Sequence, residues 1–165
     1  MLAGLLSDSI PLVSTQSVPE NFAPDSPKDL PLPVIFVHGT EDPITPYAGG
    51  MAKMYRFRPR GLGLSAQETA AYYARRNGIT AAPAVTPLTA AAAGPTRVDR
   101  TDYCQSDRLP VTLYTVHGGG HSIPGPKTAT PRFLMGRTDH ALDTAREIGE
   151  FFGLTTKVSM PEQGG

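Results

Sequence analysis

Residues 34–40 read VIFVHGT, and residues 111–118 repeat the pattern as VTLYTVHG. Each run is rich in β-branched and aromatic residues, lacks the polar–apolar alternation of a half-exposed strand, and ends in a polar loop containing glycine. This pattern is typical of parallel strands that are covered on both faces by helices. The two runs therefore predict a buried, mainly parallel sheet.

Two helices are expected to cover this sheet. Ser65 and Glu68 have capping-box spacing, and Asn77-Gly78 provides a stop, so one helix is predicted between them. A second helix is predicted to start at Thr138 or Asp139 and to end at Gly153, with its apolar stripe formed by Ala141, Ala145, Ile148 and Phe152. Strand, helix, strand and helix in this order indicate an α/β fold in which ligands gather beyond the carboxyl ends of the strands.

The remaining segments are less regular. Residues 2–6 form a short apolar run and predict a third strand, whereas residues 14–33 and 79–95, rich in proline and small residues, predict loops. Residues 96–103 alternate and can pair as a small hairpin arm. Arg56, Arg58 and Arg60 alternate with Phe57 and Pro59, and this pattern predicts a solvated loop. We expect one domain over residues 1–156 and a flexible tail over residues 157–165.

Composition excludes several classes of function. The 15 basic and 15 acidic residues cancel, which argues against binding to nucleic acid or to an anionic membrane. Cys104 is the only cysteine, so neither an internal disulfide nor a cysteine metal cluster is expected. The sequence contains no apolar run of about 20 residues that would span a bilayer, and residues 1–6 lack the basic start of a signal peptide.

The loops that follow the two main strands carry the candidate chemistry. Residues 38–47 read HGTEDPITPY, and two prolines stiffen the chain after Asp42. Residues 118–125 read GGGHSIPG and present His121 among glycines that permit sharp turns. An acid that orients a histidine, and a histidine that takes a proton from a nucleophile, follow the logic of hydrolytic triads. Asp42 before His121 matches the acid and histidine of the α/β-hydrolase order.

Four segments resemble the C-terminal half of the polyhydroxybutyrate depolymerase and feruloyl-esterase-like serine esterases, which have the α/β-hydrolase fold. The segments are residues 33–50, 63–78, 111–126 and 138–152. The resemblance implies that Asp42, in the His-Gly-Thr-x-Asp motif, is the triad acid and that His121, in Gly-Gly-Gly-His, is the triad base. It also implies Tyr47 and Ile123 as possible residues of the substrate-pocket rim.

The sequence departs from this family in three places. The Gly-x-Ser-x-Gly nucleophile elbow is absent from the 165 residues; the nearest match, Ser65, lacks the second glycine and is assigned to helix capping. Family members commonly carry an aromatic residue where this chain has Ile123. The cysteine often found after Asn-Gly is Ile79 here, so Cys104 lacks the partner that the resemblance would give it.

The resemblance implies a partial α/β-hydrolase fold. It also implies hydrolysis of carboxylic esters, such as polyesters or feruloyl esters, without a metal or organic cofactor. We expect the serine and the oxyanion hole to lie in a missing N-terminal half, so this chain alone should be inactive. The resemblance also implies an extracellular or periplasmic location.

Two other interpretations stay open at this stage. One is a non-catalytic remnant or binding module that keeps half of the fold. The other is a metal-dependent hydrolase that uses His117 and His121, although three glycines and Pro124 argue against the helix that would align these side chains. His38, at a strand end, is expected to pack and to form hydrogen bonds rather than to perform chemistry.

Overall fold

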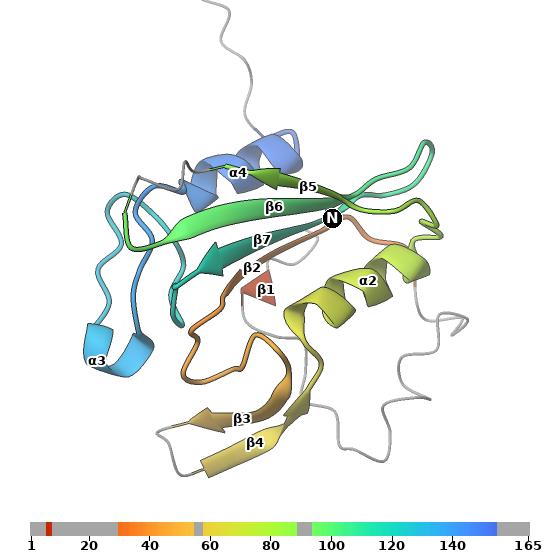
Figure 1. The fold of residues 1–165 in the computed structure, drawn as a ribbon. Helices are drawn as coiled ribbons and strands as arrows, with labels where there is room; N and C mark the ends of the chain where they lie inside the picture. The colour runs from red at the N-terminus through yellow and green to blue at the C-terminus, as the bar shows by residue number, and fades with distance from the viewer. Residues whose placement is uncertain (1–5, 8–29, 55–57, 89–93, 155–165) are drawn as a thin grey trace, which may run out of the picture.

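The computed structural model describes residues 6–7, 30–54, 58–88 and 94–154. Its main sheet has the strand order β1-β2-β7-β6-β5 (Figure 1). These strands are β1 (Leu6–Ser7), β2 (Val34–Gly39), β7 (Val111–His117), β6 (Arg97–Tyr103) and β5 (Ala84–Pro87). Of the strand predicted over residues 2–6, only its last residue lies within the described part, in β1. Most of the predicted loop over residues 14–33, and the whole predicted tail, lie outside it.

The sheet is mixed, so the prediction of a mainly parallel sheet is wrong, although the α/β character is confirmed. Strands β1, β2 and β7 run parallel, whereas β6 is antiparallel to both β7 and β5. The alternation over residues 96–103 predicted a segment that can pair as a small hairpin arm, and β6 does pair antiparallel, but on both of its edges. In the structure Arg100 and Thr112 both donate hydrogen bonds to Asp102, and this pairing allows β6 to lie inside the sheet. Strand β5 falls in the segment that was predicted to be irregular.

Helices cover both faces of the sheet (Figure 1). Helix α2 (Ala66–Arg76) packs on one face, where Ala66 and Ala70 join a buried cluster with alternate residues of β2 and β7. Helix α4 (Thr144–Phe151) covers the other face through Ile148 and Phe151. Because successive residues of a strand point to opposite faces, two such layers explain why β2 and β7 are apolar throughout.

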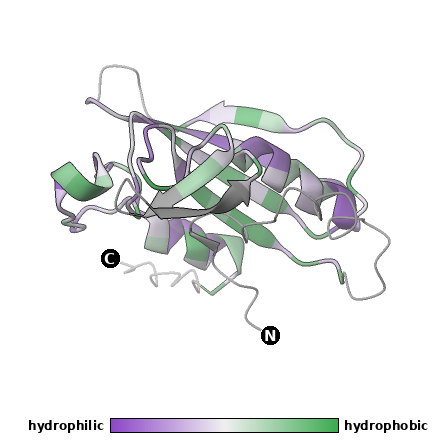
Figure 2. Ribbon diagram, turned by 90° about the horizontal axis from the view of Figure 1, so that it is seen from below, coloured by the Kyte–Doolittle hydropathy of each residue, from purple (hydrophilic) through white to green (hydrophobic). Residues whose placement is uncertain are grey.

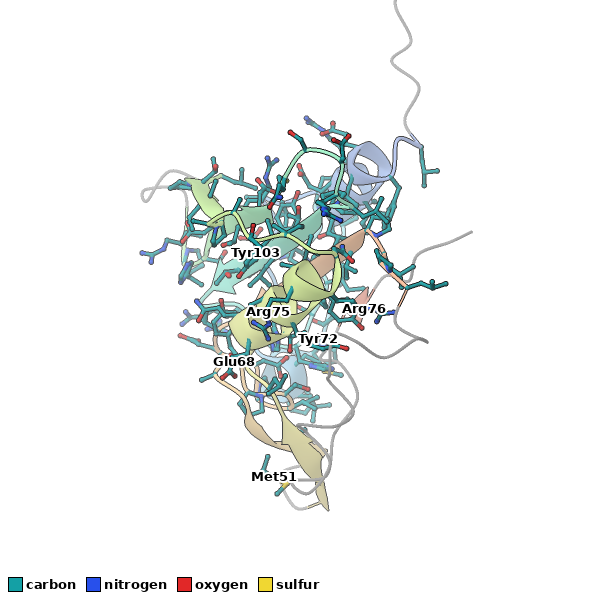
Figure 3. The ribbon with its side chains drawn as sticks, turned by 90° about the vertical axis from the view of Figure 1, so that its right-hand side faces the viewer. Met51, Glu68, Tyr72, Arg75, Arg76 and Tyr103 are labelled. Carbon is teal, nitrogen blue, oxygen red and sulfur yellow. The ribbon has the colours of Figure 1, made fainter. Side chains whose placement is uncertain are left out.

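Both ends of α2 follow the predicted capping. Ser65 accepts the Glu68 amide at 3.1 Å, and the Glu68 carboxylate accepts the Ser65 amide at 2.9 Å, which confirms the capping role of Ser65. The left-handed stop is Gly78, with φ of 73°, while buried Asn77 bonds to the backbone of Leu32 and Leu109, next to the starts of β2 and β7. Figure 3 shows α2 at the centre of the view, with Tyr72 and Arg76 labelled beside it.

Residues 50–54 and 58–63 form an antiparallel pair of strands where a solvated loop was predicted, and residues 55–57 lie outside the described part. The two strands are β3 (Gly50–Met54) and β4 (Arg58–Gly63). The β3–β4 hairpin extends away from the main sheet, below α2 in Figure 1, and Met51 lies far from the main sheet in Figure 3. Pairing of β3 with β4 satisfies backbone groups without a hydrophobic pattern, so no side-chain pattern indicated it.

The last helix begins later than predicted. Asp139 is buried and accepts the amides of Ala141 and Leu142, so it forms a separate turn, and Asp143 caps α4 through the Arg146 amide. The chain leaves α4 at Gly153, as predicted, with φ of 65°.

A short helix, α3 (Arg132–Met135), was not anticipated. It projects at the left in Figure 1, and Figure 2 shows green, hydrophobic residues on it; Phe133 is 87% exposed. Among the described residues, none of the helices combines the length and the apolar character needed to cross a membrane.

Candidate functional site

The loops that follow β2 and β7 meet at one edge of the sheet. The two strands are parallel neighbours with His38 opposite Thr115, so their carboxyl ends emerge side by side. Backbone bonds then join the loops: the Thr40 amide donates to the Val116 carbonyl at 2.9 Å, and the Glu41 amide donates to the Gly119 carbonyl at 2.8 Å. The predicted convergence of the two loops is therefore confirmed.

Glycines permit this close backbone contact. A Cβ atom at Gly39 would clash with the carbonyl oxygens of Gly119 and Gly120 in the opposite loop. A Cβ atom at Gly120 would clash with the carbonyl oxygen of Met135, at the end of α3. That same Met135 carbonyl accepts the His121 amide at 2.6 Å. The loop that carries His121 is thus held between the β2 loop and the segment after α3.

Asp42 is fixed by a turn of its own. Its Oδ1 atom accepts the amides of Ile44 and Thr45 at 2.7 and 2.8 Å, an arrangement typical of aspartate in tight turns. The side chain is only 1% exposed. Because both backbone donors bind Oδ1, the second oxygen, Oδ2, is directed to the imidazoles around it.

His121 is the principal partner of that second oxygen. Its Nδ1 atom lies 2.9 Å from Asp42 Oδ2, and its side chain is 18% exposed. Burial by itself would raise the pKa of Asp42, but hydrogen bonds from His121, His38 and the two backbone amides lower it well below its usual value. The carboxylate is therefore ionised and can only accept, so Nδ1 of His121 carries the proton. In a neutral ring this leaves the lone pair on Nε2.

His38 and Tyr47 lie directly behind the carboxylate. His38 is buried, and its Nε2 atom is 2.9 Å from the Thr45 carbonyl oxygen and 3.5 Å from Asp42 Oδ2. The Tyr47 ring meets the His38 ring edge-on, and its hydroxyl bonds to Thr115 Oγ1 at 2.8 Å. The prediction that His38 packs and forms hydrogen bonds is confirmed.

The two residues predicted at a substrate-pocket rim occupy different surroundings. Tyr47 is half-buried against the core cluster under α2. Ile123 is 43% exposed and lines an open hollow of about 550 Å³ together with Pro124, Ala145 and Ile148. Of the two residues, Ile123 is the more exposed. A rim role stays a prediction for both.

His117 does not join this site. Its Nε2 atom bonds to Asp99 Oδ2 at 2.7 Å, across the antiparallel pair of β6 and β7. His117 and His121 therefore bind different carboxylates. In the part of the chain that the structure describes, no three histidine, cysteine, aspartate or glutamate side chains are grouped to hold a metal ion.

Cys104 is exposed and free, and Ile79, at the position where the family resemblance would place a cysteine, is buried. Nearby, the Thr80 amide donates to the Gln105 side chain at 2.9 Å, so the two segments do lie side by side.

One part of the site had no signal in the sequence. The segment after α3 supports the histidine loop through carbonyl groups: the Gly120 amide donates to Arg137 and the His121 amide donates to Met135. Carbonyl acceptors belong to every residue type, so no side-chain pattern marks this segment. Gly136, with φ of 79° and a position against Gly120, is the one residue whose type the contact requires.

The site geometry agrees with one comparison to known proteins. Over 127 residues the chain is 31% identical to the "Putative esterase NocK" of Nocardia uniformis subsp. tsuyamanensis. This similarity supports an esterase-like relationship for the chain. The aligned stretch is 73% of this chain but 37% of NocK, so the chain spans well under half of that relative. No family model matches the sequence, and no solved structure matches the chain.

Proposed function

We propose that this chain supplies the acid and the base of a serine-esterase triad, with Asp42 as the acid and His121 as the base. The observation that carries the proposal is the 2.9 Å contact between His121 Nδ1 and Asp42 Oδ2, beyond the carboxyl ends of two adjacent parallel strands. In triad chemistry a buried aspartate at this nitrogen fixes the tautomer and stabilises the imidazolium that forms. The similarity to NocK supports an ester as the substrate.

The proposed reaction is an acyl transfer in two stages. A serine hydroxyl attacks the ester carbonyl while His121 takes its proton on Nε2, and the protonated ring then delivers that proton to the leaving alcohol. Water then attacks the acyl-enzyme in the same way, with His121 as base and then acid, and the carboxylic acid and the free serine are released. Throughout both stages Asp42 stays ionised and accepts the hydrogen bond from Nδ1–H of His121. These steps need no metal or organic cofactor.

The serine and the oxyanion donors are proposed to come from protein sequence beyond these 165 residues. Two observations support this. The chain contains no Gly-x-Ser-x-Gly motif, and its match to NocK leaves most of that relative unaligned. We further propose that the enzyme is of the polyhydroxybutyrate depolymerase or feruloyl esterase type, supported by the four resembling segments.

The test uses the protein encoded by the intact reading frame. The purified enzyme is assayed on 4-nitrophenyl butyrate, methyl ferulate and a 3-hydroxybutyrate oligomer, and the nucleophile is mapped with an alkyl fluorophosphonate and mass spectrometry. We expect activity, a labelled serine in Gly-x-Ser-x-Gly, and loss of turnover in His121→Gln but not in the control His117→Gln. A frame without that motif, or full activity in His121→Gln, would refute the proposal.

A further inference from the structure

We propose that His38 is a positioning residue for the candidate acid: a second imidazole whose Nε2–H holds the turn over residues 42–45 against the end of β2 and directs Asp42 Oδ2 toward His121. The inference rests on the proposed function for its catalytic meaning, because only a triad gives the orientation of Asp42 a consequence for turnover. The contacts of His38 with Thr45 and Asp42 are present in the structure whether or not the chain is an esterase.

The protonation of His38 follows from its partner. A backbone carbonyl has no hydrogen to donate, so the 2.9 Å contact with the Thr45 oxygen requires a hydrogen on Nε2 of His38. The same Nε2 atom lies 3.5 Å from Asp42 Oδ2, within reach of a weaker, shared interaction. His38 and His121 therefore present opposite nitrogens, Nε2 and Nδ1, to one carboxylate oxygen.

The position of the His38 ring is itself fixed. The residue lies on β2 directly opposite Thr115 of β7, and Tyr47 both contacts the ring and bonds to Thr115. The side chain is 7% exposed. A donor on a buried ring that packs against an aromatic neighbour loses little further conformational entropy when it holds the turn.

The consequence concerns both oxygens of Asp42. The backbone amides of Ile44 and Thr45 bind Oδ1, and His38 links the Thr45 carbonyl to the neighbourhood of Oδ2. Rotation of the carboxylate would break bonds on both sides. His121 thus meets an acceptor that is already oriented and charged, which is what triad chemistry requires of its acid.

The test compares two polar substitutions in the 165-residue chain. In His38→Gln the side-chain amide nitrogen can overlay Nε2 and keep the donor, whereas in His38→Asn it overlays Nδ1 and falls short of Thr45. His140→Gln, at an exposed histidine outside this cluster, is the control. Two signals are followed by NMR: the carboxyl ¹³C titration of Asp42 and the Nδ1–H proton of His121.

We expect His38→Asn to raise the pKa of Asp42 and to weaken or remove the His121 Nδ1–H signal, while His38→Gln and His140→Gln preserve both. Equal effects of Asn and Gln would mean that only the shape of the ring matters, and no effect of either would mean that His38 is an ordinary core residue. Each of these two results overturns the proposal.

If His38→Asn does not fold, the wild-type chain gives the answer. The Nε2–H signal of His38 must then move as Asp42 titrates, and a signal that stays fixed refutes the contact. In the complete enzyme, His38→Asn should lower kcat more than it changes KM, with rescue by Gln. The NMR readings need no catalysis, so failure of the esterase proposal and failure of this one are distinguishable.

Discussion

In the part of the chain that the structure describes, two histidine–aspartate contacts are shorter than 3 Å, and the shorter of the two is not the candidate site. His117 and Asp99 are 2.7 Å apart, whereas His121 and Asp42 are 2.9 Å apart. The first pair bridges antiparallel strands, with side chains 32% and 24% exposed. In the second pair the carboxylate is 1% exposed. Contact distance alone therefore does not distinguish the candidate pair from the other.

Three properties separate the two pairs. Asp42 is buried, it binds two backbone amides and a second imidazole, and it follows a strand parallel to the one that leads to His121. The strand arrangement places the pair at the sheet edge where α/β proteins bind ligands. His117 and Asp99 instead lie on two paired strands, where their contact bridges β6 and β7. The predictions below test this distinction.

The largest expected effect is on catalysis in the complete enzyme. Asp42→Asn should lower kcat by about 10⁴, because an amide in place of the carboxylate favours the wrong tautomer of His121. Steady-state kinetics on 4-nitrophenyl butyrate would measure the loss. Asp99→Asn is the matched control and should keep kcat within a few-fold of the wild type. Similar losses in both variants would remove the distinction between the pairs.

The next effect concerns the close packing of the candidate site. Gly120→Ala should destabilise the chain by about 1–3 kcal/mol, because the new methyl group meets the Met135 carbonyl and the backbone of Gly136. Urea unfolding at neutral pH measures this loss. Gly63→Ala is the control, since the nearest atom to its Cβ is 4.0 Å away. Equal stability of the two variants would show that the histidine loop is more loosely packed than its contacts indicate.

A third effect is the response to acid. The folded chain holds the pKa of Asp42 below its usual 3.8, so the unfolded chain binds this proton first as the pH falls. The stabilisation by Asp42 is thus complete above about pH 4–5 and is lost progressively as the pH falls toward the lowered folded pKa. Urea unfolding at pH 7, 4 and 3 should show a shallower loss in Asp42→Asn than in the wild type. Parallel curves would contradict the assignment.

The sequence predicted the parts of the molecule in which side chains carry the information. The apolar runs gave β2 and β7, the Ser65–Glu68 spacing gave α2, and the two loops gave the Asp42–His121 contact. The place of β6 inside the sheet was not predicted: Arg100 pairs with Asp102 within the strand, but the contact of Asp102 with Thr112 exists only when β6 lies beside β7.

Elements built from backbone contacts gave no side-chain signal. The β3–β4 hairpin and the carbonyl support of the His121 loop are of this kind. The start of α4 was misplaced for a related reason. Asp139 and Asp143 are both good capping residues, and they differ in that Asp139 is buried and accepts hydrogen bonds from Thr96 and from the amides of its own turn.

The smallest expected effect belongs to the shorter pair. His117→Asn removes a contact between partly exposed groups, in which the attraction is screened by water and offset by side-chain entropy, so the free energy of unfolding should change by about 0–1 kcal/mol. Urea unfolding of His117→Asn, Asp99→Asn and the double variant measures the coupling between the two side chains. A coupling well above that range would mean that the pairing of β6 with β7 depends on this contact, and the 2.7 Å pair would then be a structural element as important as the site itself. A coupling near zero, beside a large loss of turnover in Asp42→Asn, would establish burial and strand direction, rather than contact distance, as the features that separate the two pairs.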